Sequence, residues 1–161
     1  MKLEYKGVDE LAEKIRNMSN KSTGIIKRAV YEGARVLIEE VKAQISALPE
    51  VEDRRVPAGK LPLTGVTSAQ KRGLLEGVGT AHMQNNNGFI NTKVGFEGYN
   101  STRTKKYPNG QPNALIARSV NSGSSAHTKI PFMGRAATAA RAKAEAAMAA
   151  RLDEDTKKLM N

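Results

Sequence analysis

The sequence predicts an α+β fold, with long helices towards both ends of the chain and a small antiparallel β-hairpin between them. Apolar residues recur at a period near 3.6 between Ile26 and Leu48, which is the pattern of a helix buried along one face. An Asn87-Gly88 pair separates two strand-like segments and supplies the positive φ angles of a type I′ turn. Helices that are segregated from a small antiparallel sheet are typical of this class.

The N-terminal third is expected to hold two helices. Alternation of Leu and Tyr with polar residues over Met1–Lys6 indicates a short strand, and a short helix over Asp9–Met18 follows, capped by its first residue. The polar, glycine-containing stretch Ser19–Gly24 is interpreted as a break. A long helix over Ile25–Leu48 then carries the apolar stripe and ends at Pro49, because proline cannot continue a helix.

The middle of the chain predicts a long loop and then a short helix. Residues of about 50–66 are rich in proline and glycine, lack apolar periodicity and are expected to form a mobile loop. Thr67 and Gln70 have the spacing of a capping box, so a short helix is expected to end near Gly77 or Gly79.

The predicted hairpin pairs Thr80–Gln84 with Phe89–Phe96 across the Asn-Gly turn. A second mobile loop is expected over about 98–112, where proline, glycine and basic residues gather.

Two helices are expected to close the chain. Asn113 is interpreted as the N-cap of a short helix that ends at Gly123. Pro131 suits the first turn of a further helix, which is rich in alanine and runs from Phe132 to about Leu159. At 161 residues, the whole of 1–161 is expected to form a single domain.

Composition bounds the function more than the fold. The chain has no cysteine, which excludes disulfides, thiolate nucleophiles and thiolate metal sites. Met1–Val8 has no apolar segment of the kind found in signal peptides, and no stretch of about 18 apolar residues occurs, so neither a signal peptide nor a membrane span is expected. Only 4% of residues are aromatic, which predicts a thin core of the kind that neighbouring copies often complete.

The net charge of +10 is concentrated in the middle of the chain. Residues 54–118 hold 10 lysines and arginines against 2 acidic residues, whereas residues 1–53 are nearly balanced. A one-signed surface favours a polyanion or an acidic protein as partner, but a solvated surface that only aids solubility has the same signature.

No constellation of catalytic or metal-binding residues is visible. His82 and His127 are isolated from each other and from carboxylate clusters, so no metal site is expected. Glu52 and Asp53 adjoin in a predicted loop, whereas a general acid and base need two carboxylates facing one cleft. No GxSxG, P-loop or dinucleotide-binding motif occurs, and Lys60 after a glycine is a superficial match only. We therefore expect neither an enzyme nor a bound cofactor.

Eight basic residues in and beside the predicted loops are candidates for contact with phosphates or with an acidic partner. They are Arg54, Arg55, Lys60, Lys71, Arg72, Arg103, Lys105 and Lys106. No helix-turn-helix, zinc finger or RNA-binding aromatic motif accompanies them, so any contact with nucleic acid is expected to ignore base sequence.

Several stretches together resemble the minor tail component, or neck and tail-completion, proteins of long-tailed bacteriophages. Ile25–Leu48 ending at a proline is similar to the family's second helix, and Lys71–Gly79 looks like its short helix before the hairpin. Val94–Asn100 resembles its second hairpin strand and turn, and Asn113–Lys129 leads into a Pro-Phe-Met and an alanine-rich helix like the family's closing helices. The family's Pro-x-x-Thr-Gly after the long helix is displaced here to Pro62–Gly65.

The resemblance implies a structural protein of the virion that joins the tail to the head connector or completes the tail. It implies assembly in the bacterial host cytoplasm and a homo-oligomeric ring around the DNA channel, sixfold or twelvefold. The partners would be further copies of the chain and the neighbouring connector and tail proteins, with possible contact to DNA and none to membranes. The alternative is a module that binds nucleic acid without sequence preference.

Four residues are candidates for packing in the core or between subunits: Phe96, Tyr99, Phe132 and Met133. They are interpreted as packing residues rather than as a ligand pocket. Gly95 and Gly98 have a plain structural explanation, because glycine accommodates a bulge or a turn.

Overall fold

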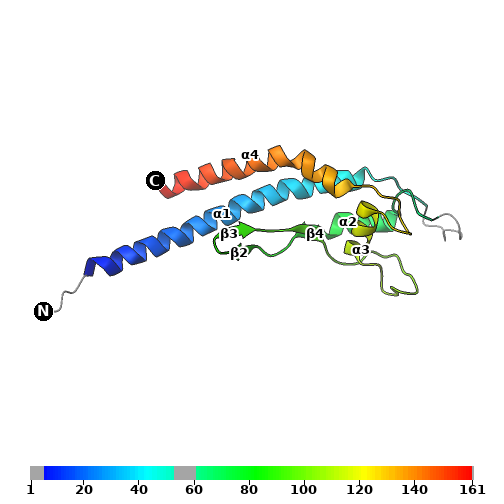
Figure 1. Ribbon diagram of the computed structural model, residues 1–161, viewed down its shortest axis with the longest axis horizontal. Coiled ribbons are helices and arrows are strands. Elements are labelled where there is room, and N and C mark those ends of the chain that lie inside the picture. Colours follow the sequence, from blue (N-terminus) through cyan, green and yellow to red (C-terminus); the bar gives the residue numbers. More distant parts are fainter. Residues whose placement is uncertain (1–5, 53–60, 161) are drawn as a thin grey trace.

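The computed structural model describes residues 6–52 and 61–160, with side chains over 19–52 and 61–159. Two long helices, α1 (Lys6–Ser46) and α4 (Phe132–Met160), lie side by side and run in opposite directions (Figure 1). We call this pair the rod. The short helices α2 (Ser68–Gly77) and α3 (Asn113–Ser122) lie at one end of the rod, and we call residues 61–77 and 97–131 the head. The predicted α+β class is confirmed.

The predicted break at Ser19–Gly24 is wrong, because α1 is continuous over 41 residues. Serine, threonine and glycine lower helix propensity by only about 1 kcal/mol each or less, which tertiary packing overrides. The Thr23 hydroxyl donates to the Ser19 carbonyl, 3.1 Å away, so the polar side chain bonds back to the helix. Lys6 is the first helical residue, and the rest of the strand predicted over Met1–Lys6 lies outside the described residues.

The predicted hairpin is confirmed and is longer than expected. Strands β2 (Gln84–Asn86) and β3 (Phe89–Asn91) pair antiparallel beside the turn, where Asn87 and Gly88 have φ of 54° and 90°. Towards the head, β1 (Val78–Thr80) pairs with β4 (Val94–Phe96), with Gly79 opposite Gly95. The resulting ribbon runs back along α1 (Figure 1).

The capping box of α2 is present as predicted. The Gln70 N–H donates to the Thr67 hydroxyl, and the Thr67 N–H donates to the Gln70 side chain. The prediction that Asn113 caps α3 is wrong, because Pro112 is the N-cap and Asn113 is the first helical residue. Its side-chain amide instead donates to the Glu97 carbonyl, 2.9 Å away, and ties α3 to the end of the hairpin.

The core lies where the head meets the rod. Val41 and Ile45 of α1, Leu74 of α2, Val120 of α3 and Phe132 of α4 are all at most 1% exposed and belong to one cluster. Four helices that are separated in sequence therefore share one set of buried side chains. Among the helices that the structure describes, none is both long and apolar enough to cross a membrane.

Candidate interaction surfaces

The basic loop over 98–112 has a defined path. Its base is closed by a bridge between Tyr99 and Pro112 and by the Asn100 N–H, which donates to the Gln111 carbonyl at 2.9 Å. Near its tip the backbone N–H of Tyr107 donates to the Thr104 carbonyl and the reverse bond also forms, each at 3.1 Å. These bonds make the loop a compact projection from the head.

Three predicted contact residues share the tip of this loop. Arg103, Lys105 and Lys106 are exposed, and the Lys106 ammonium lies 5.6 Å from the centre of the Tyr107 ring. A cation over an aromatic face is weakly attracted to it, which limits the freedom of this lysine. The tip therefore offers closely spaced positive charges of the kind that bind an anionic surface.

The other predicted basic contacts have different environments. Arg72 is exposed on α2. Lys71, by contrast, forms contacts within the chain. Its ammonium donates to the Leu48 carbonyl at 3.0 Å and lies 3.1 Å from a Glu50 carboxylate oxygen. The hydrogen bond from Lys71 lowers the pKa of Glu50. Arg54, Arg55 and Lys60 lie outside the described residues.

The head is more basic than the residues predicted for contact imply. Arg118 on α3 and Lys129 before α4 are also exposed, and sequence reasoning omitted both. Over residues 61–77 and 97–131 the chain carries seven lysines and arginines against two glutamates. Arg118 lies within α3 and Lys129 just before α4, so neither falls in the two long loops in which basic contacts were predicted.

The predicted packing residues divide into core and surface. Phe132 is 1% exposed, and its ring meets that of Phe96 edge to face with centroids 6.1 Å apart. Met133 is partly buried against the same cluster. Tyr99 is 69% exposed and therefore does not pack in the core of this chain. Tyr99 instead lies at the surface, at the base of the basic loop.

A buried polar junction at His127 was not predicted. His127 is 3% exposed, its Nδ1 lies 2.8 Å from the Ser119 hydroxyl, and its Nε2 lies 3.4 Å from Oε1 of Gln70. Because Gln70 Oε1 can only accept, we assign the ring proton to Nε2 and the Ser119 hydroxyl as donor to Nδ1. Burial lowers the pKa of His127, which favours this neutral form.

The same junction joins segments that are far apart in sequence. The backbone of Leu63 pairs with that of His127, with Leu63 N–H donating to Ala126 and Thr128 N–H donating to Leu63, both at 2.8 Å. The Gln70 amide also donates to the Gln111 side chain at 3.0 Å. The uncharged groups around the histidine thus hold α2, α3 and two loops together, which gives His127 a structural part in the head.

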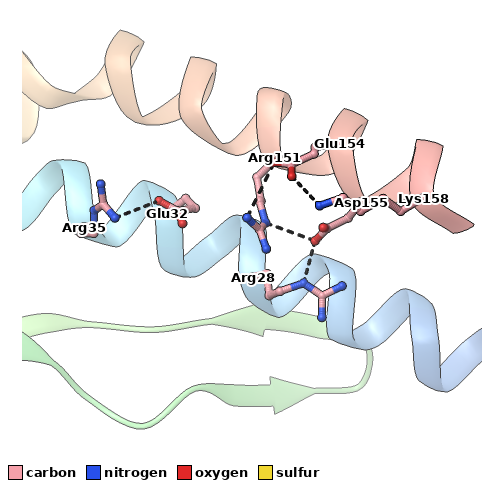
Figure 2. A network of polar contacts seen from close by, with 7 residues as sticks. All are labelled: Arg28, Glu32, Arg35, Arg151, Glu154, Asp155 and Lys158. Carbon is pink, nitrogen blue, oxygen red and sulfur yellow. Dashed lines mark hydrogen bonds and ion pairs between the residues drawn. The ribbon is translucent and has the colours of Figure 1, made fainter.

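Asp155, Arg28 and Arg151 form an ion-pair cluster, which we call the clasp, between α1 and α4 near the far end of the rod. Asp155 of α4 is 6% exposed and accepts hydrogen bonds from Nε of Arg28 on α1 at 2.6 Å and from Nε of Arg151 at 3.2 Å (Figure 2). The hydrogen bond from Arg28 lowers the pKa of Asp155, which keeps the acid charged. Because Arg28 is 127 residues away, no sequence motif could have indicated this pair.

Comparisons with known proteins found no match: no protein-family model, curated protein or solved structure matches the chain. Within residues 19–52 and 61–159, whose side chains the structure describes, no group of three or more histidine, aspartate or glutamate side chains is placed to hold a metal ion. The surfaces that the structure does offer are a basic head and a long helical rod.

Proposed function

We propose that this chain is a structural protein of a long-tailed bacteriophage or a tail-like particle, and that it joins the tail to the head connector or completes the tail. It works by binding further copies of itself and neighbouring virion proteins. The sequence resemblance described above motivates this proposal, and the division of the molecule into a rod and a basic head supports it.

The single observation that carries the proposal is this division. The rod exposes a long helical surface, of which α4 contributes many alanines (Ala137, Ala139, Ala142, Ala146, Ala149 and Ala150). Small side chains let the backbones of two helices approach closely, so such a surface suits packing against another subunit. The head supplies a separate basic surface at one end, which suits an acidic connector protein or DNA phosphates.

Nucleic-acid binding is the second candidate function. It is favoured by the exposed loop tip at Arg103, Lys105 and Lys106, next to Tyr107. Binding carried by phosphate contacts would weaken steeply as salt rises, because each neutralised phosphate releases counterions. Binding to a protein partner through apolar helix contacts would depend far less on salt.

A deletion of the gene from the phage or prophage that encodes it tests the proposal. We expect the deletion strain to accumulate heads and tails that are not joined, or tails that are incomplete, in electron micrographs of lysates. Supplying the intact chain from a plasmid should restore joined particles. Normal particles in the deletion strain would overturn the proposal.

A further inference from the structure

The two faces of the ribbon have different surroundings. Val78 is buried, and Val94 and Phe96 pack against the core, so this face lies on the rod (Figure 1). The residues between them belong to the opposite face, because successive residues of a strand alternate between the two sides. We call this second side the outer face of the ribbon, and it consists of Gly79, Ala81, Lys93, Gly95 and Glu97.

Two glycines at the centre of the outer face are not explained by the fold of this chain. Gly79 and Gly95 lie directly opposite each other, and the bulge expected at Gly95 is absent because residues 78–80 and 94–96 pair in unbroken register. Neither glycine has a positive φ, and a Cβ on either would meet nothing within 4 Å. Glycine weakens a strand, and in a strand it often marks a place where another backbone approaches closely.

A shallow hollow of about 160 Å³ lies over these glycines. The glycines and Ala81 place only backbone and one methyl group at its centre. Packed sheets usually lie about 10 Å apart because side chains fill the space between them. Without such side chains, a second backbone can approach this face more closely than in an ordinary pair of sheets.

One charged side chain stands at each end of the hollow. The Ala81 N–H donates to the Lys93 carbonyl at 2.8 Å and the Glu97 N–H donates to the Gly77 carbonyl at 2.9 Å, so the ladder continues to both charged residues. Both side chains are exposed, and within the described part of the chain neither forms an ion pair. The outer face therefore carries two unneutralised charges of opposite sign, each two residues from Gly95.

We propose that two copies of this chain pair through the outer faces of their ribbons, antiparallel and related by a twofold axis at Gly95. Gly79 and Gly95 of one copy lie against the same residues of the other. Lys93 of each copy meets Glu97 of the other, and the twofold axis forms this ion pair twice.

The positions of the charges favour a second copy as the partner. Across a twofold axis at Gly95, the residues two positions before and two positions after it face each other, which sets Lys93 against Glu97. A parallel pairing would set lysine against lysine and glutamate against glutamate. A face with charges of one sign would suit an oppositely charged partner, whereas this face is complementary to itself.

This pairing rests on the self-association in the proposed function and gives it a surface, but the two ideas fail separately. The gene deletion tests the role in the particle, whereas the mass of the purified chain tests the contact. Normal particles in the deletion strain would leave a measured pairing intact, and unjoined heads and tails would not rescue a chain that fails to pair.

A charge exchange in the full chain tests the contact. Lys93→Glu alone sets glutamates against each other at both ends of the hollow, and Glu97→Lys alone sets lysines against each other. A mixture of the two single variants restores opposite charges at both ends. The double variant that carries both substitutions restores them as well.

We expect sedimentation equilibrium to give the wild-type chain an even multiple of its 17.4 kDa mass. Each single variant should fall to half the wild-type mass, and both the mixture and the double variant should regain it. Circular dichroism checks that every variant keeps its helix content. A monomeric wild type, single variants that associate unchanged, or a mixture and double variant that stay dissociated would overturn the pairing.

A substitution at Gly95 separates the contact from the stability of the chain. Valine suits a strand and a side chain here meets no other part of the chain, so Gly95→Val should keep or raise the urea midpoint of unfolding. It should nevertheless halve the mass, because valines at the twofold axis hold the two ribbons apart.

Gly134→Ala is the matched control on the exposed surface of α4. A Cβ at Gly134 also meets nothing within 4 Å, and alanine suits a helix as valine suits a strand. This control should keep both its stability and the wild-type mass. A Gly95→Val chain that pairs like the wild type, or one that loses stability, would overturn the pairing, as would an equal loss of mass in Gly134→Ala.

Discussion

The rod and the head are held together in different ways. The rod joins two long helices through small and flexible side chains along its length and an ionic clasp at its far end. Besides its share of the apolar core, the head joins its short elements through hydrogen bonds centred on the buried side chains of Gln70 and His127. Substitutions that change the size of a side chain should therefore destabilise the rod little, whereas loss of a charged group at its far end should destabilise it. In the head, both a change in side-chain size and a newly charged side chain should lower stability.

The largest effect is expected where the two regions share their core. Phe132→Ala removes a ring that is 1% exposed and contacts Phe96, and a change of this kind typically costs about 3–5 kcal/mol. Urea unfolding followed by circular dichroism should show the rod and head losing stability together. Leu115→Ala, at a site that is 40% exposed on α3, is the control and should cost far less. Equal losses would argue against a common core.

The second-largest effect on stability is expected at a glycine in the head with rigid surroundings, compared with a glycine in the rod whose neighbour is a flexible side chain. A Cβ at Gly73 would lie 2.6 Å from Cβ of Asn100, which cannot move independently of the backbone. A Cβ at Gly33 would lie 2.6 Å from Sδ of Met148, which sits on a flexible side chain.

We expect Gly73→Ala to destabilise the protein by about 1–3 kcal/mol, as overpacking usually does. In Gly33→Ala the movement of Met148 should be offset by the better helix propensity of alanine, about 1 kcal/mol, so the net change should be small. Urea midpoints of both variants test this difference, and a Gly33→Ala variant that is the less stable of the two would contradict it.

The third effect is a pH dependence of the head. The pKa of His127 is lowered in the fold, so the unfolded chain binds its proton more readily between the folded and unfolded pKa values. Stability is therefore complete above the unfolded value of about 6.5 and falls as pH drops below it. Urea midpoints between pH 5 and 8 should show this slope, and His127→Gln, which cannot ionise there, should flatten it. An unchanged slope in the variant would show that His127 is not the source of the pH dependence.

A smaller effect is expected at the end of the rod. The pKa of Asp155 is lowered by the hydrogen bond from Arg28, so the clasp is complete above the unfolded pKa of about 3.9 and is lost as pH falls through the lower folded value. Asp155→Asn removes the charge at every pH. Amide hydrogen exchange should speed up in the last turns of α4 and not in α2. Faster exchange in both places would mean that the clasp also supports the head.

The smallest effect on stability is expected at the tip of the basic loop. Lys105→Ala with Lys106→Ala should change the unfolding free energy by no more than about 0.5 kcal/mol, because both side chains are exposed. If the head binds DNA, the double variant should weaken binding and reduce its salt dependence. Fluorescence anisotropy with labelled duplex DNA tests this, and unchanged binding would direct attention to other cations of the head.

The parts of the fold that could be predicted depend on neighbours in sequence. The turn at Asn87-Gly88 and the capping box at Thr67 and Gln70 are fixed by residues within four positions of each other. The continuity of α1 could not be predicted, since the unfavourable propensities over Ser19–Gly24 are overridden by the packing of the helix as a whole.

The candidate site was predictable to a similar extent. The exposed loop cations Arg103, Lys105 and Lys106 follow from composition alone. The use of Lys71 within the protein, and the meeting of Gln70 with His127 across 57 residues, follow only from the folded chain. Isolated histidines in a sequence therefore give no sign of whether the fold will bury them.

We propose that this chain works as a subunit of an assembly. Light scattering of the purified protein across concentration and salt, alone and co-expressed with the products of neighbouring genes, measures its assembly state. We expect a closed multimer that persists as salt rises. A chain that remains monomeric in every condition and changes mass only when DNA is added would overturn this proposal and favour the nucleic-acid-binding alternative.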